Sequence, residues 1–257
     1  MPQGTTKSAQ RIALIFAMEA EARPLIDALG LVEDGAFGDS ALPFRHFRGP
    51  LPRYPEVEIL LSLNGQDVRF GVDNIGTEPA TLNAYITMSR FKPHLCINAG
   101  TAGGFSKRGG AIGDVYISHQ PFRFHDRRIP LPGFEAYGVG SYPFADFSGN
   151  LSKVAFQLGL KEGVITTGNS LDHTDRCLEI IDQNEGAAKE MEAAAIAWVA
   201  WMIKVPFVAL KSITDIVDGA HPTSEEFLRN LSHASLKLQE KTLAFLNHLA
   251  SSNTTGQ

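Results

Sequence analysis

The stretch that decides the fold reads Lys189-Glu190-Met191-Glu192-Ala193-Ala194-Ala195-Ile196-Ala197-Trp198, a doubly acidic step followed by alanine-rich apolar residues. The apolar residues predict a buried helix, and a carboxylate at its start lies where backbone N–H groups and the helix dipole favour negative charge. Glu192 is therefore either a first-turn charge or a functional acid. Residues 206–215 follow as a buried strand that ends in Asp215. A helix and a strand that each present a carboxylate predict a pocket at the edge of an α/β sheet.

Strand and helix patterns alternate on both sides of this stretch. Apolar runs predict strands at residues 11–17, 57–63, 94–99, 113–118, 163–167 and 206–215. Helix signals cover residues 18–30, 77–91, 151–158 and 223–249, in addition to the helix that begins near Glu192. This alternation predicts an α/β fold, a single-domain three-layer sandwich with a central mixed, mostly parallel sheet flanked by helices.

Length and composition limit the classes of protein to consider. The chain has 257 residues and no linker, so we expect one domain over residues 11–250, a flexible leader at 1–10 and a flexible tail at 251–257. The net charge of −5 argues against nucleic acid as a partner. The sequence contains neither a membrane-length apolar run nor the apolar core of a signal peptide, which predicts a cytoplasmic protein without membrane contact.

Cysteine and histidine spacing gives no metal signature. Cys96 and Cys177 are far apart and form no Cys-x-x-Cys pair, and the eight histidines include no His-x-x-x-His or His-Glu-x-x-His pattern. We therefore expect no metal site and two free thiols.

Two glycine-containing segments follow predicted strands. Residues 100–104 read Gly-Thr-Ala-Gly-Gly and form neither a dinucleotide fingerprint nor a P-loop, so they are either a tight turn or a loop that a ligand approaches closely. Residues 167–172 are not a nucleophile elbow, because Asp172 stands where that motif requires glycine. A serine hydrolase is accordingly not indicated.

Residues 120–150 are long, irregular and rich in aromatic side chains. Such segments in a compact domain are usually functional, so we interpret this one as a pocket wall or a subunit contact.

Segments that share one edge of the predicted sheet carry the chemistry. They are residues 18–21, 101–104, 170–172 and 190–192, together with Asp215. Their side chains offer carboxylates, hydroxyls and methionine, with little positive charge. This set suits a neutral, hydroxyl-bearing ligand whose bond is broken by acid-base catalysis, and it does not suit a phosphate ester.

Five motifs in order resemble the 5′-methylthioadenosine/S-adenosylhomocysteine nucleosidases of the purine nucleoside phosphorylase superfamily. They are Ala-Met-Glu-Ala-Glu at 17–21, Asn-Ala-Gly-Thr-Ala-Gly-Gly at 98–104, Gly-Asp-Val at 113–115, Glu-Met-Glu-Ala-Ala-Ala at 190–195 and Ile-Thr-Asp at 213–215. The resemblance runs from Arg11 to the last helix and implies a nucleoside phosphorylase-like fold. Residues 125–130, Ser170-Leu171-Asp172 and Lys211 are most similar to the plant-type branch.

The resemblance implies a division of roles between two acids. Asp215 matches the general acid that protonates N7 of adenine, and Glu21 matches the base that takes a proton from the attacking water. The implied reaction hydrolyses the N-glycosidic bond of methylthioadenosine to adenine and the thioribose, with no cofactor.

The resemblance also implies a set of substrate-binding residues. Glu192 would accept hydrogen bonds from the ribose hydroxyls, Met191 would pack on the sugar, and Thr101 would lie near sugar and base. Leu171 lies in the turn whose backbone reads adenine, and Met18 would line the pocket near sugar and water. Glu190 and Lys211 complete the set, with Lys211 expected to position Asp215 as a point charge.

Some positions depart from the family pattern. Asn169 stands where the family more often has aspartate, whereas Leu171 and Lys211 replace a phenylalanine and an arginine common in bacterial members. The pocket for the 5′ substituent does not follow from the motifs, so acceptance of the bulkier S-adenosylhomocysteine stays open.

Alternative functions make different demands on the site. A purine nucleoside or methylthioadenosine phosphorylase would need cationic residues beside the ribose, and a non-catalytic nucleoside-binding relative would not need Glu21, Glu192 and Asp215. In a third alternative the acids are helix caps, which explains each acid alone but not their placement on one edge. The family is usually homodimeric, and we expect Phe122 to Tyr142 at or near that interface.

Overall fold

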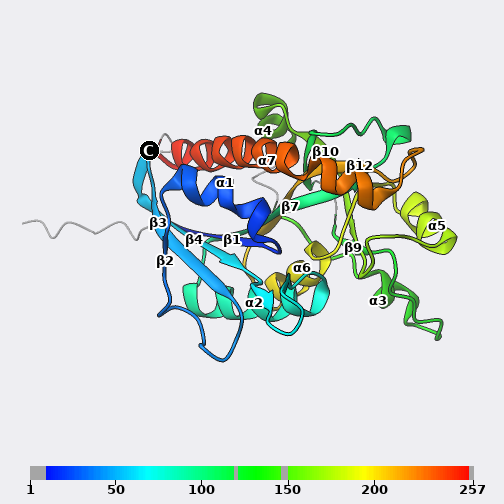
Figure 1. Ribbon diagram of the computed structural model, residues 1–257, viewed down its shortest axis with the longest axis horizontal. Coiled ribbons are helices and arrows are strands. Elements are labelled where there is room, and N and C mark those ends of the chain that lie inside the picture. Colours follow the sequence, from blue (N-terminus) through cyan, green and yellow to red (C-terminus); the bar gives the residue numbers. More distant parts are fainter. Residues whose placement is uncertain (1–9, 119–120, 146–149, 255–257) are drawn as a thin grey trace, which may run out of the picture.

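The computed structural model describes residues 10–118, 121–145 and 150–254 (Figure 1). The strands are β1 (Gln10–Phe16), β2 (Val32–Glu33), β3 (Arg45–Leu51), β4 (Tyr54–Leu63), β5 (Gln66–Asp67), β6 (Val72–Asp73), β7 (Leu95–Gly104), β8 (Val115–Ser118), β9 (Arg123–Phe124), β10 (Lys161–Thr167), β11 (Gly186–Glu190) and β12 (Phe207–Ile216). The helices are α1 (Glu19–Leu29), α2 (Thr77–Phe91), α3 (Glu135–Val139), α4 (Leu151–Leu158), α5 (Asp175–Gln183), α6 (Ala193–Ile203) and α7 (Thr223–Thr254).

The central sheet is mixed and follows the order β11-β10-β8-β12-β7-β1-β4-β3-β2. Parallel pairs join β7 to β1 and β12, and β10 to β8 and β11, whereas β12 with β8 and β3 with β4 are antiparallel. β11 also pairs antiparallel with β7, so β7, β12, β8, β10 and β11 form a closed ring. In this ring the C-terminal end of β11 pairs with the C-terminal end of β7. The pairing brings the acidic residues that follow β11 next to the residues at the end of β7.

Helices cover both faces of the sheet and confirm the three-layer prediction. In Figure 1, α1 and α7 lie along one face, and α2 and α6 lie along the other. β1 shows why both faces are covered: Ile12 and Leu14 join the core under α1 and α7, whereas Ala13 and Ile15 join the core over α2 and α6. Full burial of an isoleucine or leucine side chain stabilises the fold by ~1.5–3 kcal/mol. A strand with apolar side chains on both faces is therefore stable only when helices cover each face.

Several predicted boundaries are wrong. β7 continues through residues 100–104, because β12 pairs with it from Lys211–Gly100 to Ile216–Gly104, so this segment is strand and not a turn. The helix α5 and the strand β11 were not predicted. α7 extends to Thr254, five residues beyond the expected end, so residues 251–254 are helix where a tail is expected. The expected leader, apart from Gln10 in β1, lies outside the described residues.

The aromatic segment between β8 and α4 is largely irregular, as predicted, where it is described. Phe122, Phe124 and Tyr142 point into the core over α6, and Phe134 and Tyr137 remain exposed. None of the helices in the described ranges is both long enough and apolar enough to cross a membrane.

Candidate active site

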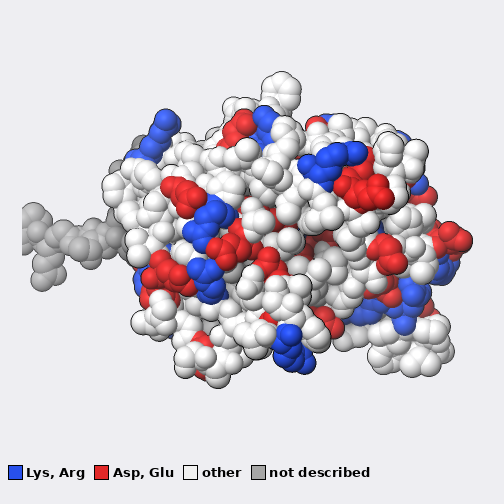
Figure 2. Space-filling view, in the orientation of Figure 1, with Lys and Arg blue, Asp and Glu red and all other residues white. Residues whose placement is uncertain are grey.

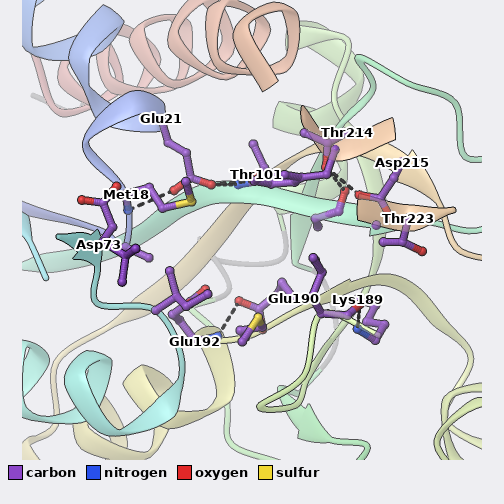
Figure 3. A pocket seen from close by; sticks show the side chains of 18 of the residues that line it. Met18, Glu21, Asp73, Thr101, Lys189, Glu190, Glu192, Thr214, Asp215 and Thr223 are labelled. Carbon is purple, nitrogen blue, oxygen red and sulfur yellow. Dashed lines mark hydrogen bonds between the residues drawn. The ribbon is translucent and has the colours of Figure 1, made fainter. Parts of the chain in front are cut away.

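A cavity of about 410 Å³ opens where the ends of β1, β7, β11 and β12 meet. This volume is within the range of small-ligand sites. Figure 2 shows acidic side chains inside a hollow on this face, and Figure 3 shows Glu21 and Asp215 on one wall with Glu190 and Glu192 on the other. The lining residues are Ala17, Met18, Glu21, Gln66, Gly71, Val72, Asp73, Ile75, Thr101, Ala102, Gly103, Leu171, Lys189, Glu190, Met191, Glu192, Thr214, Asp215, Val217, Thr223 and Phe227.

Asp215 stands at one end of the cavity, at a register shift in β12. Its Oδ1 accepts a 2.7 Å hydrogen bond from the Thr214 hydroxyl, and Oδ2 is buried without a hydrogen-bond partner among the described residues. Burial raises the pKa of this carboxyl above its ordinary value, against the opposing effects of Thr214 and of the positive charge on Lys189. A carboxyl that retains its proton and points a free oxygen at a ligand can act as an acid.

Gly103 on β7 explains how the Asp215 carboxylate reaches this position. A Cβ atom at Gly103 would lie 2.7 Å from Asp215 Oδ2 and 2.6 Å from Val217 Cγ2. Both distances are shorter than a normal contact, so only glycine leaves room for the carboxylate against the strand. Gly103 is therefore needed to make room for the Asp215 side chain, and it does not form a turn.

Glu21 is the third residue of α1 and is almost fully buried. Its Oε1 accepts hydrogen bonds from the Thr101 N–H at 2.7 Å and from the Thr101 hydroxyl at 2.5 Å. Its Oε2 accepts a longer bond of 3.3 Å from the Met18 N–H, one of the free donors at the start of the helix. These bonds hold the carboxylate toward the cavity and leave Oε2 the less occupied oxygen.

Glu192 caps α6 and faces the cavity from the opposite wall. Its Oε1 accepts a 3.0 Å hydrogen bond from the Gly76 N–H, and its Oε2 lies 3.8 Å from Lys211 Nζ. Burial raises the pKa of Glu192 to about 7, although the nearby Lys211 charge opposes the shift. Glu192 is the N-cap residue of α6, but its side chain accepts no hydrogen bond from the helix and lines the cavity instead.

Glu190 and Lys211 form a buried ion pair behind Glu192. Lys211 Nζ lies 2.8 Å from Glu190 Oε2, and both side chains are 1% exposed. Glu190 also accepts hydrogen bonds from the Thr167 hydroxyl and from the N–H groups of Glu192 and Ala193 at the start of α6. Burial favours the neutral acid, but the Lys211 charge and these bonds outweigh it, so the pKa of Glu190 is lowered. Glu190 is thus an ionised support of the site.

Lys189 supplies the only ammonium group among the described lining residues of the cavity. Its Nζ donates to the carbonyl oxygens of Ser170 at 2.7 Å and Leu171 at 2.8 Å, which ties the 170–172 turn to β11. Burial lowers the pKa of Lys189, and the negative charge of Asp215 opposes this shift. The cavity is therefore acidic, and its cation is held by backbone carbonyls.

Comparisons with known proteins agree with this geometry. A model of the phosphorylase superfamily matches residues 11–247. The 5′-methylthioadenosine/S-adenosylhomocysteine nucleosidase of Arabidopsis thaliana is 40% identical over 254 residues, which cover 97% of this chain and 96% of that protein. This chain belongs to the 5′-methylthioadenosine/S-adenosylhomocysteine nucleosidase family. It is an N-glycosyl hydrolase.

Two further relatives resemble this nucleosidase over nearly their whole length. The 5′-methylthioadenosine nucleosidase of Arabidopsis thaliana is 41% identical over 241 residues, covering 92% of this chain and 87% of the relative. A crystal structure of an MTA/SAH nucleosidase superposes with a TM-score of 0.88 at 40% identity, covering 95% of this chain and 97% of the other. The nucleoside phosphorylase-like fold is thereby confirmed.

The predicted convergence of the acidic segments in this nucleosidase is confirmed. The expected residues that line the cavity are Met18, Glu21, Thr101, Leu171, Glu190, Met191, Glu192 and Asp215. Lys211 does not line it, and the expectation that Lys211 positions Asp215 is wrong as a contact, because its ion pairs are with Glu190 and Glu192. The reason is the strand: Lys211 precedes the register shift in β12, and Asp215 follows it.

Asn169 also has a structural explanation. Its side-chain oxygen accepts a 2.8 Å hydrogen bond from the Thr77 N–H, and its Nδ2 donates to the Thr77 hydroxyl at 2.7 Å. Asn169 therefore binds the first turn of α2 and is absent from the lining of the cavity described above.

Sequence reasoning missed several residues that line the site. They are Lys189, Asp73, Val217, Thr223 and Phe227. Lys189 gave no usable signal, because β11, the strand that buries it, was not predicted. Asp73 had none, because nothing in its sequence links β6 to the cavity.

Proposed function

We propose that the enzyme hydrolyses the N-glycosidic bond of 5′-methylthioadenosine, releasing adenine and methylthioribose. The observation that carries this proposal is the arrangement of three buried carboxyl groups around one cavity: Asp215 with an unpartnered oxygen, Glu21 farther along the same wall, and Glu192 on the facing wall. Two carboxyl groups on either side of a reacting bond are the means by which glycosidic bonds are hydrolysed with an acid and a base.

Asp215 would donate a proton to N7 of adenine, so that the base leaves as a neutral molecule. The O–H bond of the carboxyl group breaks, an N7–H bond forms, and the electrons of the C1′–N9 bond move to the base. Burial raises the pKa of Asp215, which keeps the proton available for this step. Lys189 would then favour the carboxylate that forms, because its charge acts on Asp215.

Glu21 would accept a proton from the water that attacks C1′. Thr101 occupies Oε1 with two hydrogen bonds, whereas Oε2 has only the 3.3 Å bond from Met18 and is the better placed acceptor. The C1′–O bond forms as the glycosidic bond breaks, and Glu21 becomes protonated. Orientation of a base by fixed donors in this way lowers the cost of reaching the reactive geometry.

Glu192 would bind the ribose hydroxyl groups with its carboxylate. Each hydroxyl donates a hydrogen bond, and a charged acceptor makes such bonds stronger than a neutral one. Met191 and Met18 would contact the sugar, and the backbone of Leu171 would contact adenine. Glu190 and Lys211 support this arrangement from behind, as positioning residues.

A phosphorylase is the second candidate, and the charges do not favour it. Phosphate would need cationic groups beside the ribose. Lys189 is engaged by two carbonyl groups, and Lys211 is paired with Glu190 behind the wall. The ionised carboxylates among the lining residues, such as Glu190, would repel the anion. A non-catalytic role is disfavoured by the relatives, which are named as nucleosidases.

The test is adenine release from methylthioadenosine in phosphate-free buffer and in phosphate, with the sugar product identified as methylthioribose or its 1-phosphate. We expect release without phosphate, and a decrease of about 10²–10⁴-fold in kcat for Asp215→Asn and for Glu21→Gln. Release only with phosphate would make the enzyme a phosphorylase. Release by Asp215→Asn at the wild-type rate would remove Asp215 as the acid. A chelator should leave the rate unchanged.

We also propose a homodimer with residues 122–142 at or near the interface. Exposed apolar side chains support this: Phe134 and Tyr137 lie on the segment, and Leu82, Tyr85, Trp201 and Met202 lie on α2 and α6 nearby. A light-scattering mass of two chains at assay concentration is expected, and a fully active monomer would contradict the proposal. The cytoplasmic location stays a prediction that cell fractionation can test.

A further inference from the structure

The first turns of α7 lie against the strand end that carries Asp215. Thr223, the first residue of α7, lines the cavity near Asp215 (Figure 3). Two further side chains of this helix, Glu226 and Asn230, make hydrogen bonds to β12. They stand at positions i and i+4 of the helix and therefore share one face of it. The proposed reaction uses neither of them.

The edge of β12 opposite β7 needs hydrogen-bond partners at this point. On that edge, β8 and the residues just before it pair with β12 as far as Ile213, whose N–H donates to the Asp114 carbonyl oxygen. On the other edge, the register with β7 shifts between Ile213 and Asp215. The two peptide groups that flank Asp215 are thus beyond the reach of β8, and buried peptide groups require partners from another element.

Glu226 and Asn230 supply these partners. Glu226 Oε2 accepts a 2.9 Å hydrogen bond from the Ile216 N–H, which belongs to the peptide group that follows Asp215. Asn230 Nδ2 donates a 2.9 Å hydrogen bond to the Thr214 carbonyl oxygen, which belongs to the peptide group that precedes Asp215. The helix therefore fixes the backbone on both sides of the acid.

Glu226 also brings a negative charge close to the Asp215 carboxyl group. The Glu226 side chain is buried, and its Oε1 lies 3.4 Å from Nη2 of the mostly exposed Arg229. Burial is the main cause of the raised pKa of Asp215, and the charge of Glu226 raises it further. The Thr214 hydrogen bond and the charge of Lys189 on β11 oppose the shift, and β7 has no charged residue.

We propose that Glu226 and Asn230 are positioning residues, which hold the Asp215 carboxyl group where it can protonate adenine. The inference rests on the proposed function, in which Asp215 is the acid. Neither side chain belongs to the cavity lining given above, so both act through the backbone of β12 and not on the substrate. A strand end released from either bond can shift, and a small displacement of an acid slows the chemical step more than it weakens binding. Glu226 has the second effect of favouring the protonated form of Asp215.

The test measures kcat, KM and the pH profile of kcat/KM on methylthioadenosine. Glu226→Ala and Asn230→Ala each remove one hydrogen bond, so kcat should decrease about tenfold with little change in KM. Glu226→Gln retains an oxygen that can accept from Ile216 and should restore most of kcat. It lacks the charge, so the fall of kcat/KM that follows loss of the Asp215 proton should move to lower pH. On that limb we expect a value at least about twofold below wild type.

Matched variants separate charge from position. Asn230→Ala removes no charge, so it should lower kcat without moving the falling limb. Glu225→Gln removes an exposed carboxyl group from the same turn of α7 and should change neither kcat nor the limb. In an Asp215→Asn background, Glu226→Gln should have no further effect on the profile, because the group that it acts on is gone.

Wild-type kcat in folded Glu226→Ala and Asn230→Ala would overturn the positioning role, even if both variants were less stable. A profile of Glu226→Gln that superposes on wild type would overturn the effect of the charge. Either result leaves the proposed function intact, provided that Asp215→Asn lowers kcat. A wild-type rate in Asp215→Asn would remove Asp215 as the acid, and the inference with it.

Discussion

Replacement of Glu192 by glutamine should make the protein more stable at neutral pH while it weakens the enzyme. Glu192 is buried, and its pKa is raised to about 7 from an ordinary value of 4.5, chiefly by burial. The folded protein therefore retains a proton that the unfolded chain releases near pH 4.5. That contribution to stability is complete below pH 4.5 and is lost as the pH rises through 7. The glutamine side chain does not titrate, so the stability of the variant does not decrease in this way as the pH rises.

The magnitude follows from the raised pKa. At 1.36 kcal/mol per pKa unit, the difference between about 7 and 4.5 corresponds to about 3 kcal/mol. The advantage of Glu192→Gln over wild type in the free energy of unfolding should thus grow by about 3 kcal/mol between pH 4.5 and pH 8. For a chain of this size, this corresponds to about 6–12 °C in Tm. The loss of one charge-assisted bond to a ribose hydroxyl should lower kcat/KM by about 10–100-fold.

The assay is denaturant unfolding of wild type and Glu192→Gln at a series of pH values from 4.5 to 8, together with kcat/KM on methylthioadenosine. Glu56→Gln, which removes a carboxyl group from the exposed surface, is the control for the chemical change from glutamate to glutamine. A constant difference in the free energy of unfolding across the series would refute the burial argument. An unchanged kcat/KM would refute the contact with ribose.

Two further variants test the supports of the site. Lys211→Met should destabilise the protein by ~3–5 kcal/mol, because it leaves the buried Glu190 carboxylate without its partner; a loss in the free energy of unfolding below ~1 kcal/mol would contradict the importance of this ion pair. Gly103→Ala would place a Cβ 2.7 Å from Asp215 Oδ2 and 2.6 Å from Val217, so we expect a kcat at least about tenfold lower with a folded protein by circular dichroism, and a wild-type kcat would show that the carboxylate position is not critical.

Local patterns in the sequence were sufficient to predict the elements that bring Glu21 and Asp215 to one edge. Glu21 follows a continuous apolar run at a strand-to-helix junction, and Asp215 ends another such run. The C-terminal ends of parallel strands lie at the same edge of a sheet, so this placement does not depend on the exact register of the strands. Glu192 was placed for the same reason, since an acid before an alanine-rich segment marks a helix start.

Features that depend on contacts far apart in the sequence were not predictable. The antiparallel pairing of β11 with β7 closes the ring, yet neither strand contains a local signal for a partner so distant. Lys211 was assigned to Asp215 from the family resemblance, whereas in the structure a register shift separates the two residues along β12 and the Lys211 ammonium pairs with Glu190. Asp73 belongs to a short hairpin whose place over the cavity is set only by the folded chain.

The position of one cation accounts for the different protonation of the buried acids. Burial alone would raise the pKa of every carboxyl group in the cavity. Lys211 Nζ lies 2.8 Å from Glu190 and 3.8 Å from Glu192, and it makes no ion pair with Asp215. The pKa is lowered in Glu190, is raised to about 7 in Glu192, and is raised in Asp215, which makes no ion pair with a described residue.

This gradation allows one cavity to hold an ionised and a protonated acid at the same pH. Ribose binding needs Glu192 as the carboxylate, whereas departure of adenine needs Asp215 as the acid. The profile of kcat/KM against pH should therefore rise through pH 7 as Glu192 ionises. The raised pKa of Asp215 moves the fall that follows loss of its proton to a higher pH than an exposed aspartic acid would give. Because Glu192 carries the rising limb, Glu192→Gln should remove that limb and leave the fall. If Glu192→Gln instead removed the falling limb, Glu192 would be the acid and the assignment of the two roles would be wrong.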